Sequence, residues 1–461
     1  VPLGLLGEWS WPYVPAFHLT GAVIPALGLF GLYSLVAVLL WKKREAKRWL
    51  PLLLVVLVLV AWLGQIALNA ACGRGPVFLG ACVASPVSTT YYSEASRVEG
   101  VLDYIRTYPD LMPSMDQHAA THPPGAVLTY WALKGFAYNL AVSFGSLSQD
   151  WLVAHSDEVL LWRALVKRGT GADLTEMQLL GAGLVAWLIG LLGMLGLIPA
   201  FLLARKLAGL EAAVVTGLCY PLVPGQLLFL PALDLLFPPL VFTLGWLLLK
   251  SLEPRRRWVV VLAGLLLAGG VFVNFGLLAL VPLFSLFVWL LGKSLKKAPE
   301  SRKVLFGSVG LAIASFAVPM LVWAMLTDFP LMWSQAMAAH HALTATRTYS
   351  FWLGLNLLDV AVFLGLAAWP LLASGLARWP RNQSLLTLFT LSVCSILLLV
   401  DLSGSVLGEV ARIWLFFYMA LLPLIAWLAL ERLGPRWGLL PAGLALQAVA
   451  MVCSLQVIRP F

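Results

Sequence analysis

A polar stretch within a long interruption of the apolar sequence carries side chains that could accept a proton. It reads MDQHAATHPPG and contains Asp116, His118 and His122. The two prolines and the glycine after His122 cannot continue a helix, so they hold this loop above the start of a helix predicted from about Ala126. A carboxylate or imidazole placed there could act as a general base, which contributes roughly 10² to 10⁴ in rate. Alternatively, Asp116 is a turn or capping residue, and the histidines hydrogen-bond loop carbonyl groups.

Two later patches contain arginines that could form an anion clamp. GEVARIW holds Arg412 and Glu409 at i, i+3 spacing, and TATRTYSFW holds Arg347 and Tyr349. The planar fork of arginine matches phosphate oxygens and keeps its charge near lipid. The alternative for Arg412 is an ordinary interfacial arginine whose guanidinium reaches lipid headgroups.

Asp234, His340 and His341 complete the set of candidate binding residues. Asp234 lies in PALDLLFPP, where it either contributes to binding or caps a helix N-terminus. His340 and His341 open the polar patch that contains Arg347. With the histidines at 118–122 they could be interpreted as a metal site, but the spacing matches no compact ligand motif, so a divalent metal is not favoured.

The composition shows which solvent surrounds these residues. Of 461 residues, 61% are hydrophobic and 11% are charged, whereas about a quarter of a soluble domain is charged. The sequence therefore predicts one all-α membrane domain over residues 1–461, with about 12–13 transmembrane helices and a large first outer loop that carries amphipathic helices. The predicted spans are 19–41, 50–70, 178–203, 211–223, 235–251, 258–273, 277–292, 304–326, 356–376, 383–401, 413–430 and 438–456.

Two parts of this pattern are irregular. Prolines within residues 221–238 interrupt the apolar sequence and indicate a broken helix. The spans 258–273 and 277–292 are separated by only a short Asn-Phe-Gly connector, which predicts a tight hairpin.

Basic residues indicate the orientation of the spans. They collect in short connectors such as KKREAKR at 42–48, KSLEPRRR at 250–257 and KSLKKAPESRK at 293–303. By the positive-inside rule these connectors face the cytoplasm, which leaves residues 71–177 outside as one large loop. The net charge of +9 is thus a topology signal, and no basic run interleaved with aromatic residues indicates a nucleic-acid partner. On this topology the chain begins outside, so one more span or, less favoured, a cleaved signal is expected before Val1.

Carboxylates and histidines have the complementary distribution. Few of the 21 carboxylates fall in the inner connectors, and all six histidines are outside, so chemistry is expected on the outer face. Ion-coupled carriers keep ionisable residues near the bilayer midplane. Because the span centres hold little beyond Gln65 and Asn69, a carrier is disfavoured.

Two cysteines lie in the large loop. Cys72 and Cys82 both lie in the stretch ACGRGPVFLGAC, whereas the other three cysteines are in apolar runs. An oxidising outer compartment would allow Cys72 and Cys82 to form a disulfide, and two free thiols are an equal alternative.

A surface helix predicted from Glu94, in EASRVEGVLDYIRTYPDLM, precedes the His-Pro-Pro element, which leads into an apolar helix with the pair Tyr130–Trp131. This arrangement resembles the first outer loop of polytopic glycosyltransferases of the GT-C superfamily. It is most similar to the protein O-mannosyltransferases and the aminoarabinose transferases. Polar patches at 340–359 and 408–417 fit the same outline.

The resemblance implies a carboxylate base, but its usual position is altered in this chain. Those families carry an acidic residue before the His-Pro-Pro element, where this sequence has VSTTYYSEA at 87–95. The base would then be Asp116, Glu94 or Asp103, or Glu8 if a further span precedes it.

The reaction implied by the resemblance is a single displacement with inversion at the anomeric carbon. The donor would be a sugar on a polyprenyl phosphate, and the acceptor a hydroxyl of a lipid, a glycan or a protein. Because phosphate leaves as a stable anion, no general acid is needed, unlike in glycoside hydrolysis. Arg412 and Arg347 would clamp the phosphate, His122 or His118 would bind the acceptor or take its proton, and Trp131 could stack on sugar.

The resemblance further implies an active site between residues 85–125 and the outer ends of the later spans. No cofactor is expected, and membrane lipids are the only expected partners besides the substrates. The short basic loops favour a prokaryotic plasma membrane. A flippase for lipid-linked saccharides is the second interpretation, which would need a polar path to the inner face, and a non-catalytic scaffold is the third.

Overall fold

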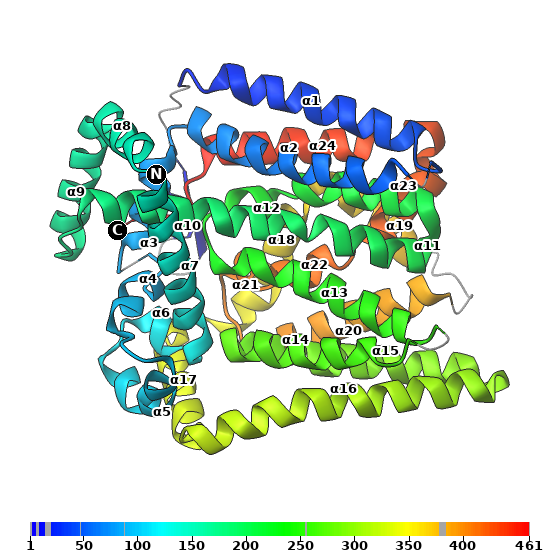
Figure 1. The fold of residues 1–461 in the computed structure, drawn as a ribbon. Helices are drawn as coiled ribbons and strands as arrows, with labels where there is room; N and C mark the ends of the chain where they lie inside the picture. Colours follow the sequence, from blue (N-terminus) through cyan, green and yellow to red (C-terminus); the bar gives the residue numbers. More distant parts are fainter. Residues whose placement is uncertain are drawn as a thin grey trace.

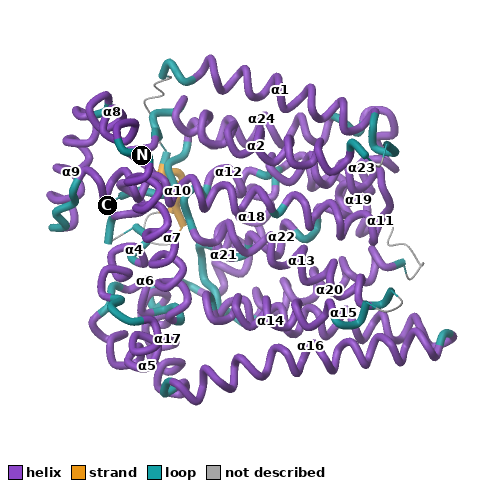
Figure 2. Tube along the Cα trace, in the orientation of Figure 1, coloured by secondary structure: helices purple, strands orange, loops and turns teal. Residues whose placement is uncertain are grey.

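The computed structural model of the chain describes residues 2–5, 9–13, 20–46, 48–86, 88–253, 256–377 and 384–460. Nearly all of this part is helical (Figure 1, Figure 2). The exception is an antiparallel hairpin of β1 (Pro2–Leu5) and β2 (Trp9–Pro12). Glu8, one of the predicted bases, lies outside the described residues.

The first half of the chain alternates long apolar helices with short ones. Its helices are α1 (Val23–Lys42), α2 (Leu50–Ala71), α3 (Pro76–Ala84), α4 (Tyr91–Glu94), η1 (Ala95–Arg97), α5 (Val101–Leu111), η2 (Met112–Ser114), α6 (Gln117–Ala120), α7 (Pro124–Ser143), α8 (Ser146–Ala154), α9 (Ser156–Thr170), α10 (Glu176–Leu195), α11 (Leu197–Cys219), η3 (Tyr220–Leu222) and α12 (Pro224–Leu228).

The second half begins with a short 3-10 helix and continues mainly with apolar helices. Its helices are η4 (Leu233–Leu236), α13 (Phe237–Ser251), α14 (Val259–Val273), η5 (Phe275–Ala279), α15 (Leu280–Ser294), η6 (Leu295–Lys297), α16 (Pro299–Leu326), α17 (Phe329–Thr344), α18 (Tyr349–Leu364), η7 (Leu366–Ala368), α19 (Trp369–Ala377), α20 (Leu385–Leu402), α21 (Val410–Ile413), α22 (Leu415–Met419), α23 (Leu422–Leu433), η8 (Gly434–Arg436) and α24 (Leu439–Ser454).

Within the described residues, 8 helices are long and apolar enough to cross a membrane, or up to 9 if one bent pair counts as a span. That pair is α18 and the segment Leu366–Gly375, which meet at 96°. The number is lower than predicted because residues 176–228 are taken together as one span, although the non-helical backbone at Gly209 (φ 89°, ψ −179°) divides them between the two predicted spans, and because α14 and α24 are short. The chain is nevertheless a polytopic integral membrane protein, as the composition predicted.

Helices α1 and α16 lie on opposite sides of the bundle and carry its most apolar exposed surfaces (Figure 1). On α1, Ile24 is 79% exposed, and on α16, Met325 is 86% exposed. Continuous apolar surface of this kind marks a face that water does not cover. The outer surfaces of these two helices are therefore the faces expected to contact lipid.

The basic connectors gather at one end of the spans, as the positive-inside pattern requires. Arg44, after α1, pairs with Glu211 of α11 at 2.9 Å. Lys206 of α11 pairs with Glu253, which follows α13. Connectors that are far apart in sequence are thus tied together at this end, which we call the basic end.

The segment between α2 and α10, predicted as the loop 71–177, folds into helices α3–α9 at the other end of the spans (Figure 1). Helix α17 joins them from the second half of the chain by packing against α5, α6 and η2. We call α3–α9 together with α17 the cap. Within it, α7 starts against the end of α14 and later packs on the start of α10, so it lies across the ends of spans.

Glycine at position 125 is required by the first of these contacts. A Cβ added to Gly125 would lie 2.1 Å from the carbonyl oxygen of Phe272. The Pro-Pro-Gly element therefore stops one helix and also lets the next one touch the backbone of α14.

The amphipathic surface helix is present but shorter than predicted. Extended backbone at Gly100, with φ −141° and ψ 128°, separates η1 from α5. In α5, Tyr104 and Tyr108 are buried, whereas Asp103 and Arg106 face outward. The predicted single helix from Glu94 is thus divided, because the backbone is already extended at Val98, where η1 ends, and is extended again at Gly100, where α5 begins.

The proline-rich region breaks the helical pattern where predicted. Between Cys219 and Phe237 the chain forms η3, α12 and η4 in place of one continuous helix. The predicted tight hairpin at 274–276 has a short connector, η5, yet its two helices diverge. Helix α14 packs mainly on α13 and α16, whereas α15 packs mainly on α20.

The five cysteines are free thiols in the structure. Cys72 Sγ lies 2.7 Å from Sγ of Cys453, at the end of α24. Of the two interpretations for Cys72 and Cys82, the structure corresponds to the free thiols, because Cys72 faces the last helix.

Candidate functional site

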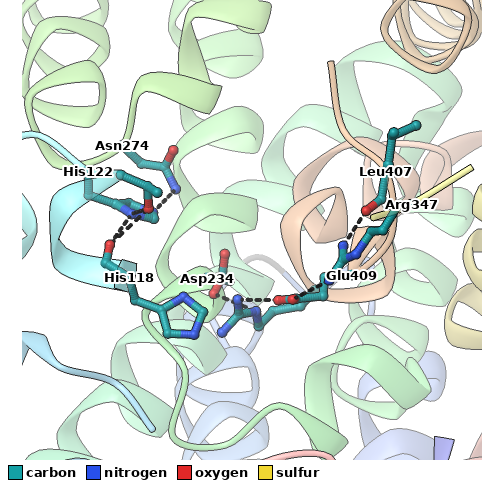
Figure 3. A network of polar contacts seen from close by, with 9 residues as sticks. His118, His122, Asp234, Asn274, Arg347, Leu407 and Glu409 are labelled. Carbon is teal, nitrogen blue, oxygen red and sulfur yellow. Dashed lines mark hydrogen bonds and ion pairs between the residues drawn. The ribbon is translucent and has the colours of Figure 1, made fainter. Parts of the chain in front are cut away.

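Four charged side chains form one network where the cap meets the spans (Figure 3). Arg412 Nη2 lies 2.9 Å from Glu409 Oε2, and Arg412 Nε lies 3.6 Å from Asp234 Oδ2. Arg347 Nη2 lies 3.3 Å from the other oxygen of Glu409. The structure therefore brings together four candidates from three segments that are far apart in sequence.

A folded loop between α20 and α21 presents Glu409 and Arg412. Asn356 of α18 organises this loop by donating hydrogen bonds to Asp401 Oδ1 (2.9 Å) and to the carbonyl of Val406 (3.0 Å). Its side-chain oxygen accepts a hydrogen bond from the amide of Gly408 at 3.2 Å. Glu409 itself has a positive φ of 58°. Non-glycine residues in this conformation are uncommon and cluster at functional sites.

The other two charged residues come from a broken helix and from the connector before α18. Asp234 lies in η4, directly after the proline-rich break, so an uninterrupted helix would not place it there. Arg347 donates a hydrogen bond to the carbonyl of Leu407, and its guanidinium lies 5.7 Å from the ring of Trp352. The break and the connector thus converge on the 403–409 loop.

Arg412 is held in its charged form and still has hydrogen-bonding capacity. Burial opposes its charge, but Asp234 and Glu409 outweigh this effect and raise the pKa of Arg412 above its ordinary value. Although burial alone would raise the pKa of Glu409, Arg412, with His118 and Arg347, holds it below its usual range. Of the five N–H donors of Arg412, those on Nη1 bond to no described residue. The Glu409 side chain is 45% exposed, so the network is open to a ligand.

The His-Pro-Pro loop is anchored by a buried tyrosine. Tyr108 of α5 donates its hydroxyl to the carbonyls of Ala119 and His122, at 3.2 and 2.9 Å. Asn274, after α14, places its side-chain nitrogen 3.4 Å from His122 Nε2. His122 Nδ1 lies 2.9 Å from the carbonyl of His118. This geometry assigns the proton to Nδ1, with Nε2 accepting from Asn274.

His122 is therefore a neutral histidine whose ring helps to hold the loop in place. Burial lowers its pKa to about 4. The ring of Tyr91 packs edge-on against it, with the centroids 5.4 Å apart. Both ring nitrogens have partners, which matches the alternative in which this histidine bonds to loop groups.

His118 differs from His122 because its ring points toward the charged network (Figure 3). Burial, and then the charge of Arg412, lower its pKa below the ordinary 6.5. Its imidazole interacts electrostatically with Arg412, Glu409, Asp234 and Asp116. The neutral imidazole that this leaves can accept a proton, so His118 is in the protonation state that a base needs, and the charge of Arg412 makes it a weaker base than a free histidine.

The three carboxylates predicted as bases in the cap have different surroundings. Asp116 occupies the N-cap position of α6, but its side chain is exposed and makes no capping hydrogen bond. Glu94 is buried and lies 3.3 Å from Arg97, and burial raises its pKa. Asp103 is on the exposed face of α5 and pairs with Arg106 at 3.6 Å. Asp116 is two residues before His118 in the chain, and its charge acts on that imidazole, so we take it as the one of the three nearest to the network.

Of the other candidates, His340 bonds to the 403–409 loop and Tyr349 bonds to the last residue of α20, directly before that loop. His340 Nε2 lies 2.7 Å from the carbonyl of Ser405, and Tyr349 donates its hydroxyl to the carbonyl of Leu402 at 2.8 Å. His341 is exposed on α17. Across the described residues, no group of three or more His, Cys, Asp or Glu side chains is placed to hold a metal ion.

Trp131 lies apart from the charged network. Its neighbour Tyr130 is fully buried and interacts electrostatically with Asp234 and Arg412. Trp131 instead lines a separate cavity together with Tyr92 and Lys134. The predicted stacking role of Trp131 therefore belongs to a different surface of α7.

Sequence reasoning missed the polar residues that hold the site in place. Asn274 was assigned only to a helix connector, and Tyr91 and Asn356 were not candidates. A signal was present, because an asparagine directly after one apolar run and another inside a later run are both costly near lipid. What could not be read was their partners, since each bonds to a segment far away in sequence.

Taken together, fold and site define a polytopic helical membrane protein whose described residues form a charged network between the cap and the spans. No protein-family model, curated protein or solved structure matches the chain. The arguments about function below therefore depend on the residues of the site and on general chemistry.

Proposed function

We propose that the protein is a membrane-embedded glycosyltransferase of GT-C type that moves a sugar from a polyprenyl phosphate to an acceptor hydroxyl. The observation that carries the proposal is the convergence of Arg412, Arg347, Glu409 and Asp234 beside His118, at the junction of cap and spans. A site for this reaction needs a cationic clamp at headgroup height and a base next to it. This network contains both.

Arg412 is proposed to bind the donor phosphate. Its Nη1 donors have no partner among the described residues, and guanidinium groups match phosphate oxygens in a planar fork. The carboxylates do not prevent this role, because Glu409 is partly exposed and can move aside as the phosphate replaces it. Arg347 would stay bonded to the loop carbonyl of Leu407 and supply the second positive charge.

Asp116 or His118 is proposed to take the acceptor proton. In a single displacement, the acceptor oxygen forms a bond to the anomeric carbon while the bond from that carbon to the phosphate oxygen breaks. The bonding electrons leave on the polyprenyl phosphate, and the acceptor proton moves to the base. Asp116 is an exposed carboxylate beside the network, and His118 is a neutral imidazole facing it, so both satisfy the chemistry.

The proposed location is the outer side of a prokaryotic plasma membrane. The basic end carries Lys and Arg connectors, and the positive-inside rule assigns it to the cytoplasm. The cap and its network would then face outward, where lipid-linked sugars are used to build the cell envelope.

The test is transfer of radiolabelled sugar from a panel of polyprenyl-phosphate sugars to lipid, glycan and protein acceptors by purified protein. We expect turnover in the wild type and its loss in Arg412→Ala and Asp116→Asn. Arg106→Ala is the matched control, because this arginine is also in an ion pair but lies on an exposed face of the cap. Turnover that survives Asp116→Asn would move the base to His118 or to one of the other predicted carboxylates, Glu94, Asp103 and Glu8. No turnover with any donor would overturn the proposal in favour of a flippase.

A further inference from the structure

A cavity lies on the side of α7 that faces away from the charged network. It has a volume of about 590 Å³ and lies between the α4–η1 segment, α7 and the first turns of α10. Tyr92, Trp131 and Tyr138 supply aromatic walls, and Gln178 and Gly181 belong to α10. Volumes of about 300–1,000 Å³ are typical of small-molecule sites.

Neighbouring residues separate this cavity from the charged network. Tyr91 packs against His122 and Tyr130, on the network side of the wall. The next residues along the chain, Tyr92 and Trp131, line the cavity. Helices α4 and α7 thus form a wall. One face of this wall borders the charged network, and the other face lines the cavity.

Lys134 gives the cavity an uncompensated positive charge. Its Nζ donates to Ser96 Oγ at 2.7 Å and lies 4.7 Å from the centre of the Tyr92 ring. Both partners are neutral, and no carboxylate of the described residues forms an ion pair with it. A half-buried ammonium without a counter-ion favours an anion as the occupant.

An apolar surface leads out of the cavity along α7. Trp131, Lys134 and Tyr138 are at helical spacing on the same face, and Val142 continues that face. Tyr138 is 55% exposed and Val142 is 54% exposed. Because α7 lies across the starts and ends of spans, this surface is at the height of lipid headgroups.

We propose that the cavity binds the phosphate-bearing headgroup of a membrane lipid, with the phosphate on Lys134 and the apolar part along the Tyr138–Val142 face of α7. The aromatic walls would contact the headgroup body, as tyrosine and tryptophan do in membrane interfaces. The site is distinct from the proposed donor site. It depends on charge complementarity and on the position of α7, and it does not require glycosyl transfer.

The experiment measures lipid retention by native mass spectrometry after reconstitution in phosphatidylcholine nanodiscs that contain a minor fraction of phosphatidylglycerol. When the wild-type protein is released from the nanodiscs, the lipid that stays bound to it should be enriched in phosphatidylglycerol over phosphatidylcholine. Lys134→Gln should lose that enrichment by about tenfold. Gly135→Phe should lose it to a similar extent by filling the cavity, since a Cβ at this position meets nothing within 4 Å.

The matched control is Lys293→Gln, because Lys293 lies 3.5 Å from the centre of the Trp289 ring but at the basic end and outside the cavity. It should retain the enrichment. Equal loss in Lys293→Gln would mean that bulk charge attracts the lipid and would overturn the proposal. Unchanged retention in both Lys134→Gln and Gly135→Phe would do the same.

A second arm separates a lipid from a soluble phosphate ester. Glycerol 3-phosphate, added in excess to the reconstituted protein, should not displace phosphatidylglycerol, because it lacks the apolar part that contacts Tyr138 and Val142. Full displacement would overturn the lipid assignment. Because the readout is bound lipid, these results are independent of whether the protein transfers sugar.

Discussion

Glu253 and Glu409 are each held by two cations, at opposite ends of the spans. At the basic end, Glu253 pairs with Lys206 and, at 2.6 Å, with Lys250, and these hydrogen bonds lower its pKa to about 2. At the cap, Glu409 pairs with Arg412 and Arg347. Similar charges therefore meet in both places, but what surrounds each cluster differs.

Around Glu253, the ion pairs simply join connectors between helices. Around Glu409 there are also a second carboxylate, Asp234, an imidazole, His118, and a positive φ. Tying two segments together requires none of these additions. The comparison teaches that an ion pair indicates function through its neighbours and its backbone, and less through the pair itself.

The largest difference between the two ends should appear when the cation is exchanged. Arg412→Lys keeps the charge but removes the planar fork, so we expect transfer to fall by about 10² to 10³, the loss typical of one stabilising donor at a reacting centre. Lys206→Arg at the basic end should stay within about twofold, because a surface pair tolerates either cation. Initial rates of sugar transfer measure both. Equal effects at the two ends would contradict the distinction.

The next largest effect should come from His118. Because burial and the Arg412 charge lower its pKa below 6.5, the neutral imidazole persists as pH falls through 6.5, and the rate should decline only at lower pH. His118→Ala should lower kcat by about 10- to 100-fold and remove that acidic limb. His155→Ala is the control, since His155 is in the cap but stacks on Trp151. An unchanged pH profile in His118→Ala would leave Asp116 as the base.

Much of the fold follows from the composition and from the spacing of apolar and basic residues along the chain. Apolar runs, basic connectors and the proline-rich break were all readable, because lipid and backbone geometry impose them locally. The number of full-length spans was not, since α14 and α24 are shorter than the bilayer pattern suggests. The length of each helix depends on the helices that pack against it, and the sequence of a single segment does not show which helices those are.

The residues of the candidate site could be predicted from the sequence, but their arrangement in space could not. Arg412, Arg347, Glu409, Asp234 and His118 were all candidates, and they do meet. The sequence could not separate His118 from His122, because the difference depends on Asn274, which lies 3.4 Å from the second histidine. Nor could it place Trp131 beside a different cavity, since one residue of helical rotation decides which side it faces.

Glycine-to-alanine substitutions at the cap and at the basic end should give the next, smaller difference between the two ends. Gly408 has φ +87°, and a Cβ there would lie 2.6 Å from Arg347 Nη1. Gly408→Ala should lower the free energy of unfolding by about 1–3 kcal/mol and raise the KM for the donor, because Arg347 must move. Gly434 also has a positive φ, +52°, but no atom lies within 4 Å of its Cβ. Gly434→Ala should therefore cost only about 1 kcal/mol and leave the KM unchanged.

The smallest effect should come from Glu253 itself. Glu253→Gln removes two surface pairs, so its free energy of unfolding at neutral pH should change by less than about 1 kcal/mol, with no change in transfer rate. The direction in which this stabilisation changes with pH is defined, because the pKa of Glu253 in the folded protein, about 2, is below the ordinary 4.5. The stabilisation is present above pH 4.5 and is lost as pH falls toward 2. Thermal unfolding of the wild type and the variant should therefore converge across that range. A loss of transfer activity in Glu253→Gln would mean that the basic end also influences the reaction, and the contrast with Glu409 would then fail.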